Sequence, residues 1–308
     1  MVLLWIAAAL VLLSALAGAW VFKSGVCRPN IKGELPMGHA MKRFEAEIRA
    51  GEEWFDAQPW EEAEIHAPDG IKLRGRFLPA AESKGTLLMM HGFQGSGRRD
   101  FAGISRRVHE LGYNMLVPDQ RAHWRSEGRY ICFGVKERYD CLEWIRWLNA
   151  EIGEGTDIFL QGMSMGSTTV LMTAGLELPE NVRGIIADCG FTSPWEIMKY
   201  VVKTRLRLPP FPLMWFVWLY ARVFAGYSLS GYSTLDAMKR CRLPVLLIHG
   251  EDDKFVPHEM SERNYAACAA EKTLIVVPGA RHGLSYLVDK PRCDGELLRF
   301  LEKNGRKE

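Results

Sequence analysis

An apolar run opens the chain. Residues 1–22 contain no Asp, Glu, Lys or Arg, and only Ser14 and Gly18 fall outside the hydrophobic residue types. As an α-helix, residues 2–22 would extend about 30 Å, which matches the hydrocarbon core of a bilayer. A helix that packs on a soluble domain is apolar on one side only, whereas this run is apolar on every face. The pattern therefore predicts a membrane-spanning helix over residues 1–22.

Two interpretations of this helix remain open, a retained membrane anchor and a secretory signal peptide. A signal peptide carries basic residues before its apolar core, and none precedes this one, although the small residues between 15 and 19 would suit cleavage. The length of the run favours the anchor. Because Lys23, Arg28 and Lys32 follow it, the positive-inside rule favours the cytoplasmic side for the rest of the chain.

A helical pattern follows within the connecting segment 23–60. Four apolar residues recur there at spacings of four, three and four: Met37, Met41, Phe44 and Ile48. This spacing places them on one face of an amphipathic helix over residues 37–50. We expect the helix to pack on the globular domain, and a helix that lies on the membrane surface is the alternative.

From about residue 61 the pattern changes to short apolar strands. Pro68, Asp69 and Gly70 form a turn between the first two, which predicts an antiparallel hairpin. The later strands alternate with helical stretches, as in βαβ units with a mostly parallel sheet buried on both faces. The predicted strands are 63–67, 71–78, 86–90, 114–117, 157–160, 184–187, 244–248 and 273–277. With right-handed crossovers, they give a doubly wound α/β sandwich over residues 61–305.

One connection in this fold is too long for a single helix and its loops. Fifty-six residues separate the strand that ends at Ala187 from the next one, about twice the usual length. We interpret residues 191–240 as a small helical cap over the carboxyl edge of the sheet. Its apolar stretch, 213–224, is too short to span a membrane. Its aromatic residues, among them Trp215 and Trp218, either line a substrate pocket or pack the cap onto the domain.

Composition and charge exclude several classes of protein. The 308 residues include 39 basic and 37 acidic side chains, a formal net charge of +2, without the basic cluster of a nucleic-acid-binding protein. Seven cysteines, an odd number with no C-x-x-C pair, indicate neither a disulfide framework nor a zinc site and fit a reducing compartment. No G-x-G-x-x-G follows the first strand, and no Walker A lysine is found. We therefore expect no nucleic acid, no metal and no cofactor.

A turn with the pattern G-x-S-x-G follows strand 157–160. It runs from Gly162 to Gly166 and has Ser164 at its centre. In a doubly wound sheet, ligands bind beyond the carboxyl ends of the strands, which is where this turn lies. The glycines let strand and helix approach closely, and the serine is exposed at a helix N-terminus. Ser164 is therefore the candidate nucleophile.

A serine hydroxyl needs a base, and His282 is the candidate among eight histidines. It follows the last strand and so lies at the same edge of the sheet. His91 and His249 also end strands, but each precedes a glycine in a tight turn, where we expect it to fix a loop by hydrogen bonds. His123 lies on a neighbouring loop, and no role is assigned to it.

The remaining parts of a serine active site also have candidates. An imidazole base needs an orienting carboxylate, and three acids follow strand 244–248: Glu251, Asp252 and Asp253. The spacing alone does not choose among them. Backbone N–H groups that stabilise an oxyanion are expected from Met165, directly after Ser164, and from Phe93, in the loop after strand 86–90.

These motifs together resemble the α/β-hydrolase superfamily over about residues 60–305, and most of all its bacterial serine hydrolases with a short cap. Serine, acid and histidine follow one another in the order of that family. The segment 249–257 has the family's H-G-x-x-D-x-x-V-P form, which implies Asp253 as the acid. The other matching motifs are His91-Gly-Phe, Gly162-Met-Ser-Met-Gly166, Asp188-Cys-Gly-Phe-Thr-Ser193 and Arg281-His-Gly283. Membrane segments occur at the N-terminus of relatives, which supports the anchor.

One loop departs from the family pattern. The family's D-x-R-G-H-G-x-S loop corresponds to residues 119–126, where Ala122 and Trp124 replace two glycines. A side chain as large as Trp124 is expected to restrict the mouth of the site and hence the size of the substrate.

The resemblance implies a membrane-anchored serine hydrolase that cleaves carboxylic esters through an acyl-enzyme. The anchor and the apolar cap favour a small acyl substrate that is lipid-derived. Thioester or short-peptide hydrolysis on the same triad is the alternative, because the fold does not determine the substrate. An acyltransferase is a further alternative. A non-catalytic binding module that keeps the fold would predict a broken triad, and this one is intact.

Overall fold

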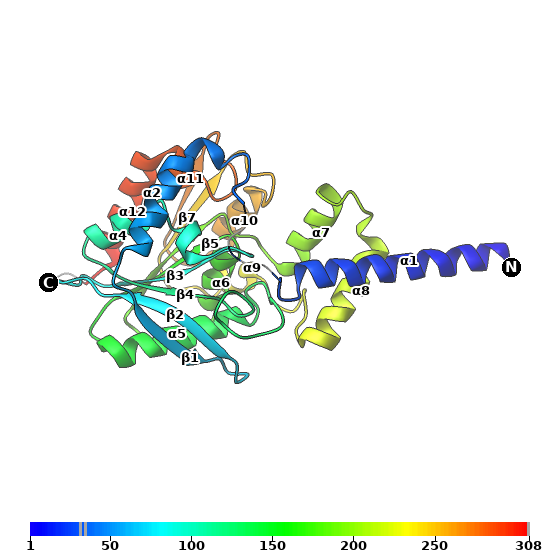
Figure 1. The fold of residues 1–308 in the computed structure, drawn as a ribbon, viewed down its shortest axis with the longest axis horizontal. Helices are drawn as coiled ribbons and strands as arrows, with labels where there is room; N and C mark the ends of the chain where they lie inside the picture. Colours follow the sequence, from blue (N-terminus) through cyan, green and yellow to red (C-terminus); the bar gives the residue numbers. More distant parts are fainter. Residues whose placement is uncertain (31–32, 34–35, 307–308) are drawn as a thin grey trace.

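An eight-stranded sheet forms the centre of the computed structural model, which describes residues 1–30, 33 and 36–306 (Figure 1). The strand order is β1-β2-β4-β3-β5-β6-β7-β8, with β2 antiparallel to both its neighbours and parallel pairing from β4 to β8. The strands are β1 Glu61–His66, β2 Lys72–Leu78, β3 Thr86–Met90, β4 Asn114–Pro118, β5 Ile158–Met163, β6 Val182–Asp188, β7 Val245–Gly250 and β8 Lys272–Val277. The predicted mostly parallel α/β sheet with an antiparallel hairpin at its edge is confirmed.

Successive residues of the central strands enter two separate apolar layers. In β3, Leu88 and Met90 belong to one buried cluster and Leu87 and Met89 to the other. Side chains of a strand point alternately to the two faces of its sheet, so this sheet is buried on both faces. That burial explains why the central strands are continuous apolar runs in the sequence.

Helices cover both faces of the sheet. α5, α6, α9 and α10 adjoin the first layer, and α2, α4 and α12 adjoin the second. The helices over the sheet and its edges are α2 Glu45–Asp56, α3 Gly97–Asp100, α4 Ser105–Glu110, α5 Glu137–Ile152, α6 Met165–Thr173, α9 Thr234–Met238, α10 Glu259–Ala267, α11 Ser285–Val288 and α12 Lys290–Asn304. This three-layer arrangement exposes the carboxyl edge of the sheet to the loops that carry the candidate site residues.

The amphipathic helix expected over residues 37–50 begins later than predicted. A short 3₁₀ turn, η1 Lys42–Phe44, leads into α2, and Met37 and Met41 lie before both. Pro36 and Gly38 disfavour a helix across that region. The buried face of α2 consists of Ile48, Glu52 and Phe55, and Glu52 is ion-paired with Arg98 and Arg99. The helix packs on the domain, as expected, but of the four predicted apolar residues only Ile48 belongs to its buried face.

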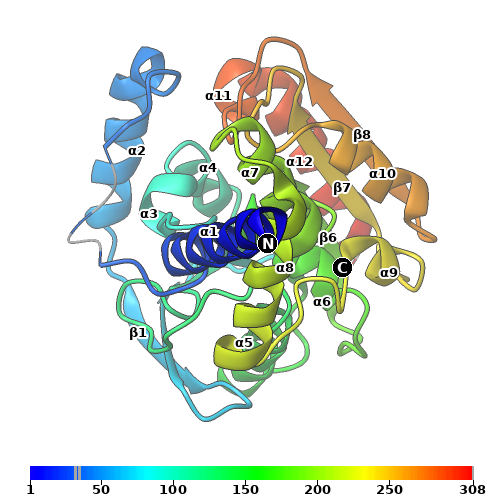
Figure 2. The same cartoon turned by 90° about the vertical axis from the view of Figure 1, so that its right-hand side faces the viewer.

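The N-terminal helix and the cap form a second body beside the sheet (Figures 1 and 2). α1 Val2–Gly25 lies against α8 Pro210–Tyr220, next to α7 Pro194–Thr204 and the π-helical turn η2 Ala221–Ala225. Within the described residues, α1 is the one helix long and apolar enough to cross a membrane. Lys32, one of the basic residues expected to follow the span, lies outside the described residues.

Candidate active site

Ser164 lies at the tight turn between β5 and α6. Its backbone is in a left-handed region, with φ 54° and ψ −112°, which is strained for a residue with a side chain. A Cβ at Gly166 would overlap the carbonyl oxygen of Met90, and one at Gly162 would overlap the backbone of Gly166. Only glycines therefore allow α6 to approach the sheet this closely, and the turn presents the Ser164 hydroxyl at the first turn of the helix.

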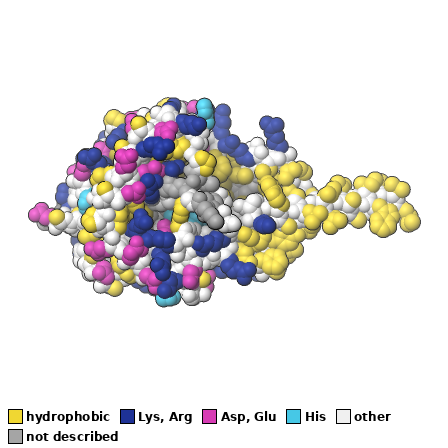
Figure 3. All heavy atoms as spheres, in the orientation of Figure 1, with side chains coloured by type: hydrophobic (Ala, Val, Ile, Leu, Met, Phe, Trp, Pro, Cys, Tyr) yellow, Lys and Arg dark blue, Asp and Glu magenta, His cyan; other side chains and the backbone are white. Residues whose placement is uncertain are grey.

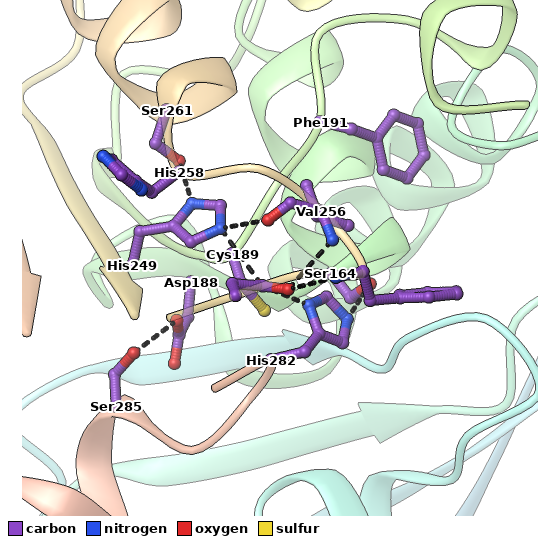
Figure 4. A network of polar contacts seen from close by, with 12 residues as sticks. Ser164, Asp188, Cys189, Phe191, His249, Val256, His258, Ser261, His282 and Ser285 are labelled. Atoms are coloured by element: carbon purple, nitrogen blue, oxygen red, sulfur yellow. Dashed lines mark hydrogen bonds and ion pairs between the residues drawn. The ribbon is translucent and has the colours of Figure 1, made fainter. Parts of the chain in front are cut away.

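His282 connects Ser164 to Asp253 (Figure 4). Its Nε2 lies 2.9 Å from the Oγ of Ser164, and its Nδ1 lies 2.6 Å from the Oδ2 of Asp253. Because a carboxylate only accepts, the neutral ring carries its proton on Nδ1 and leaves Nε2 free to accept the serine proton. The ring of Phe255 packs edge-on against the imidazole at 5.0 Å between centroids, which fixes its orientation.

Asp253 is fully buried and accepts hydrogen bonds on both oxygens. Oδ1 accepts the N–H groups of Phe255 and Val256 at 2.8 and 2.9 Å, and Oδ2 is shared by His282 and His249. Burial opposes ionisation of this carboxyl, but the hydrogen bonds from the two histidines outweigh it and hold the pKa of Asp253 well below its usual range. The group is therefore a carboxylate at neutral pH.

His249 supports the site in a way that the sequence analysis did not assign. Its Nε2 faces two acceptors, the carbonyl oxygen of Val256 at 2.9 Å and Oδ2 of Asp253 at 3.2 Å, so this nitrogen carries the proton. Its Nδ1 then accepts the hydroxyl of Ser261 at 2.7 Å. The expected loop-fixing role is confirmed, and the same ring also orients the buried acid. Its place four residues before Asp253, at the end of β7, was the available signal.

The two backbone N–H groups expected to face an oxyanion belong to Phe93 and Met165. Met165 is the first residue of α6, and Phe93 follows β3 and lines the same cavity as Ser164. Among the described residues, neither N–H donates a hydrogen bond to another group of the protein. Both donors are thus available to a bound oxygen next to Ser164.

The loop after β3 is held by two histidines. Nε2 of His123 accepts the N–H of Gln94 at 3.0 Å, while Nδ1 donates to the carbonyl of Arg121 at 2.8 Å. Burial lowers the pKa of His123 to about 3, so the ring stays neutral and keeps Nε2 as an acceptor. His91 accepts the N–H of Gln120 at 3.0 Å and confirms the loop-fixing role expected of it. His123 was missed because its partner lies on another loop.

The three tryptophans predicted for the substrate pocket lie elsewhere. Trp124, with a left-handed φ of 41°, donates from Nε1 to the carbonyl of Gly95 at 2.6 Å and lines a separate cavity. Trp218 donates to the hydroxyl of Ser228 at 3.1 Å, and Trp215 is 59% exposed on α8. None of the three lines the cavity at Ser164. Trp124 braces the loop after β3 instead of narrowing that cavity.

Ser164 and His282 line a cavity of about 480 Å³. Its wall is mostly apolar and comes from the face of the sheet that α2, α4 and α12 cover. The apolar lining includes Met41, Ile48, Phe101, Ile104, Ile186, Leu287 and Leu297. Residues 191–240, all of them described, contribute nothing to this wall. Of the two cap tryptophans, Trp218 is partly buried within the cap, as the packing interpretation expects, whereas Trp215 is 59% exposed and fits neither interpretation.

Asp188 ends β6 and Cys189 follows it, and both lie near Ser164 and His282 (Figure 4). Burial raises the pKa of Asp188 to about 7 and that of the Cys189 thiol well above its usual value. Donor atoms of Cys189, Asp253 and His282 lie within 4.8 Å of one another, a spacing that a metal ion could bridge. Both nitrogens of His282 already have partners and the thiol resists ionisation, so the group fits a metal poorly. Cys189 packs as a small buried side chain, as expected.

Two family profiles match consecutive parts of the chain. The profile of the alpha/beta hydrolase fold matches residues 85–211, and that of the serine aminopeptidases S33 matches residues 212–286. The two matches extend from β3 to the loop that carries His282 and include the turn at Ser164.

Relatives match most of the chain at low identity. The uncharacterized protein YqkD of Bacillus subtilis (strain 168) is 26% identical over 236 residues, which are 76% of each chain. A lysophosphatidylserine lipase of Macaca fascicularis, ABHD12, is 23% identical over 242 residues, which are 73% of this chain and 57% of that protein. Among solved structures, an esterase of Pyrococcus furiosus has a TM-score of 0.65 at 23% identity and covers 91% of this chain and 98% of its own. At this identity, the likeness to the esterase shows the fold alone.

Proposed function

Since this chain belongs to the α/β-hydrolase fold family, we propose that it is a membrane-anchored serine hydrolase that cleaves carboxylic esters. One observation carries the proposal. The hydroxyl of Ser164, at a strained turn, is hydrogen-bonded to His282, which is hydrogen-bonded in turn to the buried carboxylate of Asp253. A nucleophile, a base and an orienting acid in this chain of contacts have the arrangement of an acyl-transfer triad.

In the proposed first step, Oγ of Ser164 attacks the carbonyl carbon while Nε2 of His282 accepts the hydroxyl proton. The carbonyl oxygen becomes an oxyanion that the N–H groups of Phe93 and Met165 stabilise. Loss of one such donor typically costs about 3–4 kcal/mol of transition-state stabilisation. The carboxylate of Asp253 stabilises the imidazolium that forms.

The second half of the reaction releases the products. His282 gives its proton to the leaving alkoxide, so the C–O bond of the ester breaks and an acyl group remains on Ser164. His282 then deprotonates a water molecule, which attacks the acyl-enzyme. The carboxylic acid leaves, and the proton returns to Ser164.

The cavity supports an acyl group of hydrocarbon character. Apolar side chains, such as those of Ile104 and Leu287, line the same cavity as Ser164. A relative named as a lysophosphatidylserine lipase agrees with a lipid-like ester as substrate. We therefore place a lipid-derived acyl chain in this cavity and its carbonyl carbon at Ser164.

A short peptide is the second candidate substrate, because the serine aminopeptidase profile matches residues 212–286. The ammonium group of a peptide N-terminus would need an ionised carboxylate in the cavity. Of the carboxyl groups that line it, Asp188 has a pKa raised to about 7 by burial, and Asp100 accepts the N–H of Gly92. The mostly apolar wall of the cavity favours the ester as substrate, and a thioester fits the same wall.

The proposal includes α1 as a retained anchor. Gly18 of α1 packs directly against Phe216 and the backbone of Leu213 in α8. Cleavage at the small residues 15–19 would remove this contact and expose the buried side of α8. Lys23 lies in the last turn of α1 and Arg28 follows the helix, so the positive-inside rule favours a cytoplasmic catalytic domain.

Steady-state hydrolysis by the full-length chain in detergent tests the proposal. We expect activity on p-nitrophenyl esters and slower turnover of thioesters and aminoacyl anilides. Ser164→Ala should lower kcat/KM by roughly 10⁵-fold or more, because it removes the nucleophile. Ser167→Ala is the matched control, since its buried hydroxyl has no partner among the described residues and lies on the same helix.

Three results would overturn the proposal. The first is that Ser164→Ala keeps its activity, and the second is that anilides turn over faster than esters. The third is that an added alcohol acceptor captures most of the acyl group. The last result would indicate an acyltransferase. Far-UV circular dichroism of each variant establishes that the fold is retained.

A further inference from the structure

α8 and η2 expose large apolar side chains that the protein itself does not cover. Phe211 is 74% exposed, Trp215 59%, Leu219 44% and Val223 63%, and these four residues recur at every fourth position. Figure 3 shows the corresponding hydrophobic patch beside the base of α1. A contiguous apolar patch of this kind marks a surface that another apolar phase or partner covers.

The contact between α1 and α8 determines how deep this patch would lie in a membrane. Residues 2–13 of α1 are exposed on every side, and the part that contacts α8 begins at about Ala15, whose carbonyl accepts the hydroxyl of Tyr220 at 3.2 Å. At Gly18 a Cβ would lie 2.7 Å from the Cβ of Phe216, so the two helices touch closely there. α8 is therefore level with the second half of α1.

The free part of α1 is too short to span a bilayer by itself. As a helix, residues 2–13 extend about 18 Å, whereas the hydrocarbon core is about 30 Å thick. If α1 crosses the membrane, its second half must also lie in the bilayer. The cap helix that packs on this half then enters the near leaflet with it.

The charges of the cap fit an anionic lipid surface. Between Glu196 and Asp236 the sequence has five basic residues and no acidic one. Three of the basic residues are exposed: Lys203 in the last turn of α7, and Arg205 and Arg207 between α7 and α8. Figure 3 shows Lys and Arg side chains beside the apolar patch. Basic residues that flank an apolar helix face are typical of segments that lie in the interface of a bilayer with anionic lipids.

We propose that the cap docks on a lipid bilayer: α8 and η2 insert their exposed apolar face into the near leaflet beside α1, with the basic residues among anionic headgroups. This inference rests on the proposal that α1 spans the bilayer. It is independent of the chemistry at Ser164.

The position of the active-site cavity agrees with this docking. Gln94 lines the cavity, and its side-chain amide donates to the carbonyl of Ser24, at the end of α1, at 3.5 Å. The cavity therefore lies next to the membrane surface on which the cap docks. A lipid substrate has a short path from the leaflet to Ser164.

Spin labels on the full-length chain in nanodiscs of phosphatidylcholine and phosphatidylglycerol test the docking. Cys27→Ser removes the one cysteine that is not fully buried. Single labels are then placed at Trp215→Cys on α8, at Leu10→Cys on the free part of α1, and at Tyr139→Cys on α5, where the native side chain is 40% exposed. Collisions with oxygen, which partitions into lipid, and with Ni(II)-EDDA, which stays in water, are measured at each position.

We expect the labels at 215 and 10 to lose Ni(II)-EDDA collisions and gain oxygen collisions relative to the label at 139. A label at 215 as accessible to Ni(II)-EDDA as the label at 139, with the label at 10 in lipid, would overturn the docking and leave the anchor intact. Labels at 10 and 215 that are both in water would overturn the docking together with the anchor. A label at 215 shielded from both reagents and broadened by a second spin would assign the patch to another copy of the chain, and would also overturn the proposal.

Discussion

Two regions of the molecule differ in which side chains they bury and which they expose: the edge of the sheet that carries Ser164, and the cap that carries α8. At the sheet edge, polar groups are buried and paired: Asp253 accepts from two histidines and two backbone amides. In the cap, apolar groups are exposed, and Phe211 and Trp215 contact little of the protein. Each arrangement would be unfavourable in the surroundings of the other.

This difference indicates that the two regions are adapted to different surroundings. Paired and buried polar groups hold a reactive geometry inside the protein, where unpaired ones would be costly. Exposed large apolar groups are favourable only next to an apolar phase. We therefore expect substitutions at the sheet edge to change the chemistry, and substitutions on the cap to change how the substrate is reached.

The largest expected effect comes from the base. His282→Ala should lower kcat/KM on a short soluble ester by about 10⁵- to 10⁶-fold, because nothing else accepts the proton of Ser164. His258→Ala is the control, since the ring of this half-buried histidine lies within 4 Å of the carboxylates of Glu259 and Glu262, at the start of α10. Near-wild-type activity of His282→Ala would show that His282 is not the base and that the reaction does not take place at this edge of the sheet.

The orienting acid should have the next largest effect. Asp253→Asn should lower kcat/KM by about 10⁴-fold, because an amide no longer stabilises the imidazolium and can select the wrong tautomer. Asp252→Asn, at the exposed neighbouring residue, should leave kcat/KM close to wild type. The two variants are compared on the same soluble ester. A larger loss for the Asp252 variant would reverse the assignment of the acid.

A charged cap should affect only substrate that is presented in a membrane. Trp215→Glu combined with Val223→Glu should lower the hydrolysis of a long-chain ester in anionic vesicles by about 30-fold, if each lost apolar contact contributes roughly 1 kcal/mol. Hydrolysis of a soluble acetyl ester should be unchanged. Tyr139→Glu, on α5, is the control for added surface charge. Equal losses on both substrates would mean that the cap substitutions also change the chemistry at the sheet edge, and not only the access of a substrate in the membrane.

The smallest expected effect is on stability. Burial raises the pKa of Asp188 to about 7, so the folded chain holds this proton more tightly than the unfolded chain does. The contribution of this group to the free energy of unfolding is fully present below the usual aspartate pKa of about 4, and it is lost as the pH rises through about 7. Asp188→Asn cannot ionise, so its melting temperature should fall less between pH 5 and 8, by a few degrees. Thermal unfolding of both proteins in one detergent measures this, and identical pH dependences would contradict it.

Sequence patterns predicted the sheet and the candidate triad because both depend on local signals. Apolar runs marked each of the strands to within a few residues, and the turn at Ser164 requires two glycines that are visible in the sequence. The roles of Ser164, His282 and Asp253 stay predictions, although the structure brings the three side chains within hydrogen-bonding distance of one another.

The wall of the cavity and the surroundings of the cap were not predictable in the same way. The cavity wall combines Met41 and Ile48, from the connecting segment, with residues as far along the chain as Leu297. The buried face of α2 includes Glu52, whose ion-pair partners Arg98 and Arg99 lie far away in the sequence. Likewise, Phe216 and Tyr220 of the cap pack on α1, and nothing in their spacing shows that contact. Long-range packing decided each of these features.

Covalent labelling with a fluorophosphonate tests the central claim most directly, because the reagent reacts with an activated serine and leaves its phosphorus on that oxygen. The full-length chain is labelled, digested and examined by peptide mass spectrometry, alongside Ser164→Ala. The account predicts one adduct per chain, on the peptide that contains Ser164, and none in the variant. An adduct on another residue, or labelling that persists in Ser164→Ala, would contradict it.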